Sequence, residues 1–352
     1  MRSGCPHFAP FAGKVISVAA IVSLLVTAGF TQIDTCQQGS QLFYQHRWQE
    51  AAETFQNCEL KSPGKTDALL YRAKSLVNLA DFPGAGAALD SYIASHRDSD
   101  DALYLLGYVR FRQDQPRKSL DAFAGAAKLK APQAGDLKIA ALDYVLLNDY
   151  ESAAQYLEQS LKMNPQDAEA RYHLGRVRYQ QNQFDLAIAA FEEVLRQEPA
   201  NVKAEDNLGL CLEAKNQNEK AVAAYRKAIE MDATATVRIA QPYIDLGKLL
   251  NTLNRAPEAE PDLFEAVKIQ PDSASAHYEL GRALFLLGHL EDSQSQLTEA
   301  IRLDSDNSSP HYLLGRVYSR MGKAQLAAEQ FKMTETLIHR QNSKSGGMAS
   351  QH

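Results

Sequence analysis

The chain has 352 residues, of which 45% are hydrophobic and 23% charged, so its composition is that of a folded protein and not of a disordered one. A mean hydropathy of -0.35 excludes a membrane protein with many spans. The formal net charge of -6 argues against nucleic acid as a partner, because phosphate binding needs a basic face.

The N-terminal residues have the pattern of an export signal. Arg2 and Lys14 precede an uncharged run from Val15 to Phe30. This run is shorter than the roughly 20 residues that cross a bilayer comfortably. Residues 1–28 are therefore predicted to be a cleaved signal peptide, with an uncleaved inner-membrane anchor as the alternative. The protein is expected in the periplasm or otherwise outside the cytoplasm, and at a membrane only through this segment if it stays uncleaved.

Three cysteines lie beyond the predicted signal, at Cys36, Cys58 and Cys211. They form no CxxC motif and no Cys/His cluster, so neither a metal site nor a cofactor is predicted. Cys36 and Cys58 fall in one helical hairpin of the repeat described next. They are either a disulfide, which an oxidising compartment permits, or two buried small apolar residues, since sequence does not establish their separation.

A unit of 34 residues recurs along the rest of the chain. The segments that begin at Arg171 and His277 align without a gap, and the copies share a Leu-Gly pair, a small residue 12 positions after the Gly and a bulky residue 16 positions after it. The glycines are Gly107, Gly175, Gly209, Gly247, Gly281 and Gly315. The copies start near 32, 66, 100, 134, 168, 202, 240, 274 and 308, so about nine repeats fill residues 32–338.

Each unit carries two apolar stripes of helical period, separated by a polar turn. Small residues on both helices let the two backbones approach, which predicts an antiparallel helical hairpin. One hairpin cannot bury both of its faces, so neighbouring hairpins are expected to stack into a right-handed superhelix with a concave groove. The predicted fold class is therefore all-α, an α-solenoid of about nine hairpins.

The repeat is irregular at one joint, and the chain changes character near its end. Four extra residues precede Ala240, and Pro257 and Pro261 follow in the second helix of that repeat. Pro261 removes a backbone hydrogen bond inside a helix, so we expect a kink or a changed stacking angle there, as a functional hinge or as a local irregularity. Residues 339–352, with Ser, Gly and Lys, are predicted to be a disordered tail.

This pattern resembles the tetratricopeptide repeat family, of the type that bacteria export. The resemblance covers residues 32 to about 338 and includes the family's closing proline at Pro63, Pro165, Pro199 and Pro271. It implies that the first helix of every hairpin lines the groove, and that the outward residues of these helices contact a ligand.

The candidate groove residues follow from that resemblance. Three repeats carry a Tyr and an Arg one helical turn apart, a fourth carries a Lys in place of the Arg, and a fifth continues the aromatic row. They are Tyr172 with Arg176, Tyr278 with Arg282, Tyr312 with Arg316, then Lys248, and Tyr104 with Tyr108. Such a ladder can bind a peptide by stacking on Tyr while Arg binds carboxylates or carbonyls. The alternative is that these side chains only cover the helix face.

No HExxH, GxSxG, GxGxxG or GxxxxGKS motif occurs, and the repeats leave no domain to house chemistry, so the chain is predicted not to be an enzyme. We expect a scaffold or adaptor of the cell envelope that binds peptide or protein partners in its groove. The alternative is a regulatory or targeting subunit of an envelope enzyme complex, for example in polysaccharide synthesis or export.

Overall fold

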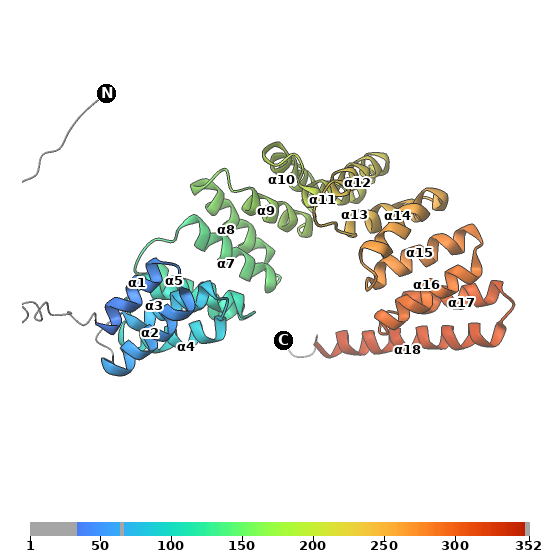
Figure 1. Ribbon diagram of the computed structural model, residues 1–352. Helices are drawn as coiled ribbons and strands as arrows, with labels where there is room; N and C mark the ends of the chain where they lie inside the picture. Colours follow the sequence, from blue (N-terminus) through green and yellow to red (C-terminus); the bar gives the residue numbers. More distant parts are fainter. Residues whose placement is uncertain (1–33, 64–66, 349–352) are drawn as a thin grey trace, which may run out of the picture. The chain divides into compact units, whose positions relative to one another are not determined.

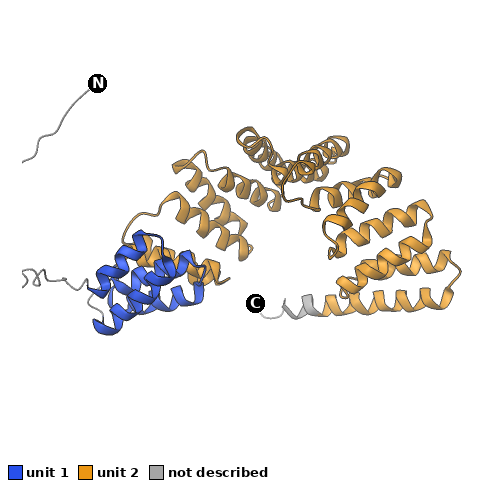
Figure 2. Ribbon diagram, viewed as in Figure 1, with its two compact units in different colours: residues 1–98 blue, residues 99–352 orange. Residues whose placement is uncertain are grey.

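The computed structural model describes residues 34–63 and 67–348 of the chain. Across these residues it contains eighteen α-helices and no strand, which confirms the predicted all-α helical repeat fold. The helices fall into two compact units, residues 1–98 and 99–352 (Figure 2). The predicted signal peptide, residues 1–28, lies outside the described residues. No helix in the described part of the chain has both the length and the apolar content to span a bilayer.

The first unit consists of two hairpins. Its helices are α1 (Thr35–Tyr44), α2 (Trp48–Lys61), α3 (Ala68–Asn78) and α4 (Phe82–Ser95). A disulfide joins Cys36 of α1 to Cys58 of α2, with their Cα atoms 5.1 Å apart. Phe55 and Ala51 of α2 are buried against α1, together with Cys58. The disulfide thus closes the first hairpin at the end opposite its turn.

The second unit consists of seven hairpins (Figure 1). Its helices are α5 (Asp100–Arg112), α6 (Pro116–Ala127), α7 (Ala134–Leu146), α8 (Tyr150–Met163), α9 (Ala168–Gln180), α10 (Phe184–Gln197), α11 (Val202–Ala214), α12 (Asn218–Ala233), α13 (Gln241–Thr252), α14 (Ala256–Ile269), α15 (Ala274–Leu287), α16 (Leu290–Leu303), α17 (Ser308–Arg320) and α18 (Ala324–Met348). The odd-numbered helices are the first helices of the hairpins, and each begins at or close to a repeat start expected from the sequence.

Each hairpin is held together by the contact between a small and a large residue that the repeat pattern predicts. A Cβ atom added to Gly209 of α11 would lie 2.6 Å from the ring of Tyr225 on α12, and one added to Gly175 would lie 2.8 Å from Phe191. Both aromatic rings are fully buried. The two helices can approach this closely only because the first helix has no side chain at that position.

Every hairpin turn contains one residue in the left-handed backbone region. These residues are His46, Ala80, Asp114, Asn148, Asn182, Asn216, Asn254, Gly288 and Gly322. Asn and Gly adopt this conformation most readily. At the start of most first helices, a Ser, Asp or Asn side chain accepts a hydrogen bond from a backbone N–H of the first turn, as Asp167 does from Ala170 at 2.9 Å. Turns and caps therefore set the ends of the helices.

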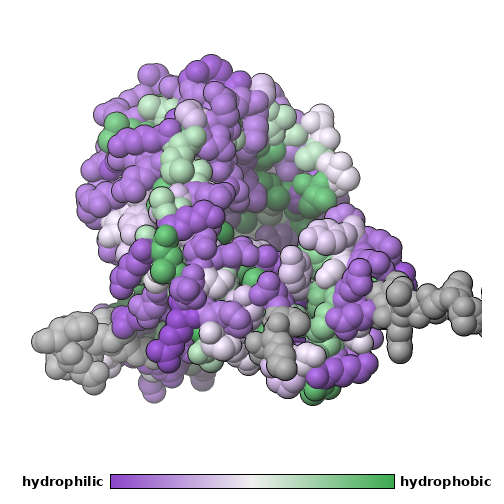
Figure 3. Space-filling view, turned by 90° about the vertical axis from the view of Figure 1, so that its left-hand side faces the viewer, coloured by the Kyte–Doolittle hydropathy of each residue, from purple (hydrophilic) through white to green (hydrophobic). Residues whose placement is uncertain are grey.

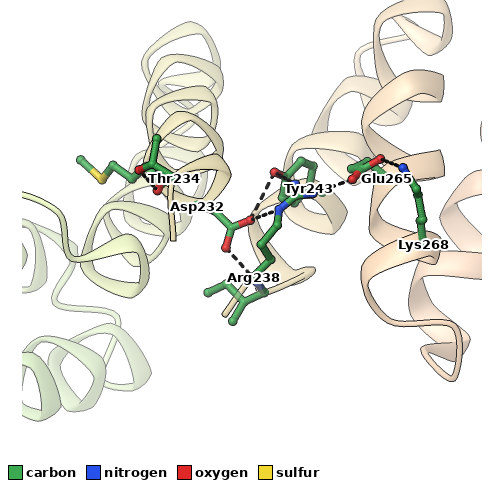
Figure 4. Close-up of polar contacts among 8 residues, drawn as sticks. Asp232, Thr234, Arg238, Tyr243, Glu265 and Lys268 are labelled. Carbon is green, nitrogen blue, oxygen red and sulfur yellow. Dashed lines mark hydrogen bonds and ion pairs between the residues drawn. The ribbon is translucent and has the colours of Figure 1, made fainter. Parts of the chain in front are cut away.

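The four extra residues lie in the connection between α12 and α13, where a polar network orders them (Figure 4). The buried carboxylate of Asp232 accepts hydrogen bonds from the backbone N–H of Ile239 at 2.8 Å, from Nε of Arg238 at 3.2 Å and from the hydroxyl of Tyr243 at 3.3 Å. Arg238 also donates to Tyr243 and, at 2.6 Å, to Glu265 of α14. The joint is thus tied to both of the hairpins that it links.

Two other sequence predictions concern Pro261 in α14 and the C-terminal tail. α14 runs unbroken from Ala256 to Ile269 with Pro261 inside it. The predicted disordered tail, 339–352, is wrong as far as Met348, because α18 continues to that residue. Arg340 pairs with Asp306 at 3.2 Å and Gln341 donates to the backbone carbonyl of the same residue, so contacts to the preceding connection extend the helix.

Candidate peptide-binding face

The first helices of the second unit form one face of that unit. α5 contacts α7, and α9, α11, α13, α15 and α17 contact one another in sequence. We call the exposed side chains of these helices the first-helix face. On the side of the molecule drawn in Figure 3, hydrophilic residues predominate and hydrophobic ones form separate groups. The large exposed apolar side chains are likewise scattered along the chain.

The predicted tyrosines lie on this face to different degrees. Tyr172 and Tyr278 are half-buried, whereas Tyr312 is 51% exposed. The ring of Tyr172 packs on Phe191 of α10, with centroids 5.8 Å apart, and its hydroxyl accepts a hydrogen bond from Asn207 of α11 at 3.2 Å. Tyr172 therefore connects its own hairpin to the next, and Tyr312 offers the largest free ring surface of the three tyrosines.

Three of the four predicted cations are exposed. Arg176, Arg316 and Lys248 are exposed. The guanidinium of Arg316 lies over the ring of Phe285, 4.8 Å from its centroid. Arg282 is half-buried and forms an ion pair with Glu279, with 3.5 Å between the guanidinium nitrogen and the carboxylate oxygen. The structure therefore brings the four cations to one face on consecutive or alternate first helices, where the exposed ones can reach a partner.

Tyr104 and Tyr108 are the predicted residues of α5. The hydroxyl of Tyr104 donates to the backbone carbonyl of Lys130 at 2.6 Å. Tyr108 accepts a hydrogen bond from Arg112 at 2.7 Å, and the same guanidinium lies 5.7 Å from its ring centroid. Both phenols therefore have partners within their own hairpin.

A pocket of about 410 Å³ unites two predicted residues with others that the sequence did not single out. Tyr172 and Arg176 line it together with His173, Asn201 and Lys203. Burial lowers the pKa of His173, so its imidazole is neutral at physiological pH. Burial also raises the pKa of Tyr172. The cations Arg176 and Lys203 are thus the charged donors of this pocket.

Glu169 also lines this pocket, and Lys138 of α7 pairs with its carboxylate and with that of Asp167. Its ammonium group lies 2.7 Å from Glu169 and 3.0 Å from Asp167. Burial acts to lower the pKa of Lys138, but the two carboxylates outweigh it and the pKa is raised. Lys138 therefore stays charged and joins the fourth hairpin to the fifth.

Sequence reasoning also missed two buried acids between α11 and α13. Asp206 and Asp245 are almost fully buried. Burial and the charge of Asp245 raise the pKa of Asp206 to about 8. Asp245 accepts a hydrogen bond from Gln241 at 2.8 Å. A signal existed, because Asp206 stands three residues before the repeat Gly, where other copies have Tyr172 and Tyr278.

The histidines and possible metal ligands of the described residues were the remaining candidates for a chemical site. Among the described residues there is no group of three or more His, Cys, Asp or Glu that could hold a metal ion. His277 and His311 are buried and bonded through Nδ1 to Gln296 and Gln330, at 2.7 and 2.8 Å. These histidines serve as links between the two helices of a hairpin.

Sequence comparison identifies the family. A tetratricopeptide repeat family model matches residues 70–134, 140–202, 174–236, 244–308 and 278–336. The chain therefore belongs to the tetratricopeptide repeat family, as its repeat pattern predicts. Its fold is accordingly that of a protein–protein interaction scaffold. No curated protein matches the chain.

Solved structures show the same fold. The chain is similar to a tetratricopeptide repeat protein from Parabacteroides merdae, with 16% identity and a TM-score of 0.58 over 76% of this chain and 98% of that one. It is also similar to the C-terminal part of a repeat-containing protein from Cytophaga hutchinsonii, with 18% identity and a TM-score of 0.57 over 70% and 99% of the two chains. At such identities the likeness concerns the fold alone.

Proposed function

We propose that this chain is a non-catalytic adaptor of the bacterial cell envelope, which binds a peptide or protein partner on its first-helix face. The observation that carries the proposal is the recurrence of an exposed cation at the same repeat position of several first helices, at Arg176, Lys248 and Arg316. Exposed cations that recur at one repeat position can bind the carbonyls and carboxylates of an extended or helical peptide.

An extracytoplasmic location fits two features. The first is the predicted signal peptide at residues 1–28. The second is the disulfide between Cys36 and Cys58, because disulfides persist in oxidising compartments and are rare in the cytosol. The mass of the protein, purified separately from the envelope and cytosolic fractions of its native cells, tests this proposal. A mature N-terminus near residue 29 is expected, and a full-length cytosolic protein with both thiols reduced would overturn it.

A triple variant tests the binding face. We expect the substitution of Arg176, Arg282 and Arg316 by Ala to weaken capture of the native partner from envelope extract by at least about tenfold, since each charge-assisted hydrogen bond contributes about 1.5–3 kcal/mol. The helical circular dichroism should stay unchanged, because Arg176 and Arg316 are exposed.

A control variant with the same loss of charge separates the face from the net charge. Lys162, Lys220 and Lys332 are exposed on the second helices α8, α12 and α18. Their replacement by Ala also removes three positive charges and should leave capture intact. Equal capture by the two triple variants would refute the proposed binding face.

A further inference from the structure

A pocket of about 220 Å³ lies between the hairpins α5–α6 and α7–α8. α6 has 12 residues, whereas α8 and α10 have 14 each. The connection from α6 to α7 spans residues 128–133, longer than the connections 164–167 and 198–201 that follow. Only the short side chains of Ala124 and Ala127 line the pocket at the end of α6. The early end of this helix thus leaves space between two hairpins.

Aromatic rings from both hairpins form the walls of this pocket. Tyr104 and Phe123 come from the first hairpin, with ring centroids 6.2 Å apart, and Tyr144 and Tyr156 come from the second, with centroids 5.2 Å apart. The hydrogen bond from Tyr104 to the carbonyl of Lys130 fixes the first ring. We call this space the aromatic pocket.

The surroundings of the aromatic pocket are acidic. Asp136 lines it, and its Oδ2 accepts a hydrogen bond from the backbone N–H of Gln133 at 2.8 Å, which holds the carboxylate in place. An adjoining pocket shares Tyr104 and Asp136 and adds Asp100 and Asp101. The one cation among the residues lining these two pockets is Lys130, which is mostly exposed and lies 3.3 Å from Asp100.

The pKa of Tyr104 is raised by burial and by the same negative environment. Burial raises the pKa of this phenol, and the charges of Asp136 and Asp100 raise it further. A positive group in the pocket would therefore meet a favourable potential, in addition to the negative faces of the aromatic rings.

We propose that the aromatic pocket receives an arginine or lysine side chain of the bound partner. This inference rests on the proposed function and names the chemistry of one contact. The aliphatic stem of such a side chain packs against Leu120 and Leu137, and its charged head lies among the rings with Asp136 as counter-ion. An apolar side chain would fill the space but would leave the carboxylate of Asp136 without compensation for the water that it loses.

A pair of synthetic peptides tests this proposal on the full mature chain. The probe is a blocked nonapeptide of Gly and Ser with one central Arg, and its control carries citrulline, which has the same shape without the charge. Binding is followed by NMR chemical shifts of the tyrosine rings. We expect millimolar binding of the Arg peptide, about tenfold weaker binding of the citrulline peptide, and shifts at Tyr104, Tyr144 and Tyr156. Equal affinity for the two peptides would overturn the proposal.

Two substitutions at one ring and one at the carboxylate localise the effect. Tyr156→Phe keeps the ring and should keep the preference for Arg, whereas Tyr156→Leu should lose most of it. Asp136→Asn retains a side-chain acceptor for the N–H of Gln133 but no charge, so the preference should fall severalfold. A preference that survives both Tyr156→Leu and Asp136→Asn would place the cation elsewhere. Choline that binds more tightly than the Arg peptide would assign the pocket to a free quaternary ammonium ion and contradict a peptide occupant.

The result of the peptide test is independent of the result of the triple-variant test of the first-helix face. If the Arg peptide fails to bind while the triple arginine variant loses its partner, the proposed occupant of the aromatic pocket is wrong and the proposed function stands. If the peptide binds with the expected preference while the triple variant captures its partner normally, the pocket stands and the binding face is wrong.

Discussion

Asp143 occupies a core position of α7 that aligned hairpins give to Val109, Val177 and Val317. Its side chain is fully buried, and neither carboxylate oxygen has a hydrogen-bond partner in the described part of the chain. The nearby hydroxyl of Ser119 donates instead to the carbonyl of Gly107 at 2.8 Å. Burial therefore raises the pKa of Asp143 to about 7, although Ser119 acts in the opposite direction.

This pKa makes stability depend on pH. Below about pH 4 the carboxyl is protonated in both the folded and the unfolded state, and its neutral form is tolerated in the core. As the pH rises towards 7 only the unfolded state ionises, so the free energy of unfolding falls until the folded pKa is passed. Asp143→Val should reduce the loss of stability between pH 5 and pH 8 by about 2 kcal/mol in urea titrations. An identical pH dependence of the variant and the parent would contradict this prediction.

The repeat glycines provide a second prediction at this scale. Gly209→Ala would place a Cβ atom 2.6 Å from the buried ring of Tyr225, which cannot move aside because its hydroxyl donates to Glu213 at 2.9 Å. We expect a loss of about 1–3 kcal/mol in the free energy of unfolding. Gly135→Ala is the matched control, since nothing lies within 4 Å of the added atom. This control should raise the free energy of unfolding by about 0.5 kcal/mol. Equal effects of the two substitutions on stability would refute the packing argument.

Residue patterns predicted some of these contacts and not others. The contacts of Gly209 with Tyr225 and of Gly175 with Phe191 follow from a fixed spacing that every hairpin repeats. The burial of Asp143 and Asp206 does not follow from such a spacing, because each is a single departure from its repeat position. A departure of this kind identifies an unusual residue in the sequence, but its burial depends on how the neighbouring hairpin packs against it.

At the scale of the element, the joint between α12 and α13 depends on one buried carboxylate. Asp232→Ala would leave the backbone N–H of Ile239 and the Nε of Arg238 without their acceptor (Figure 4). We expect a loss of about 2–3 kcal/mol in thermal or urea unfolding. Lys268→Ala is the control in the same network, because its side chain is 78% exposed, and it should change stability by less than about 0.5 kcal/mol. An Asp232→Ala variant with unchanged stability would show that the network does not order the joint.

The disulfide of the first hairpin makes a prediction specific to one unit. Cys36 and Cys58 are 22 residues apart, and closing a loop of this size stabilises a fold by about 3 kcal/mol. The single Trp of the chain, Trp48, lies in α2 against Phe43, so its fluorescence reports on this unit alone. Reductant, or the Cys36→Ser/Cys58→Ser variant, should lower the urea midpoint seen by Trp48. A midpoint unaffected by either treatment would contradict a structural disulfide.

The elements themselves were largely predictable, and the exceptions have physical causes. Hairpin positions follow from the 34-residue spacing. The polar network around Arg238 does not follow from this spacing, because the four inserted residues have no counterpart in the other repeats. The length of α18 was also missed, since Ser and Lys in its last turns resemble a tail, whereas the contacts of Arg340 and Gln341 with Asp306 extend the helix.

At the scale of the whole molecule, the chain is an array of hairpins in two units, and its function depends on which face meets a partner. The family establishes a protein-interaction scaffold, and the exposed cations favour the first-helix face of the second unit. The sequence predicted these cations from a repeat position, but it did not predict the pocket of Tyr172 and Lys203 or the aromatic pocket. Both pockets lie between hairpins, where their shape depends on how neighbouring units pack.

Photo-crosslinking from single positions tests the binding face most directly. A benzophenone side chain would replace Lys203 or Lys248 on first helices, and Lys162 or Lys220 on second helices, in the protein expressed in its native envelope. All four positions are exposed, so access alone does not distinguish them. The first two should form covalent adducts with the same partner protein, and the last two should form none. Adducts from the second helices alone, or equally from all four positions, would contradict a partner held on the first-helix face.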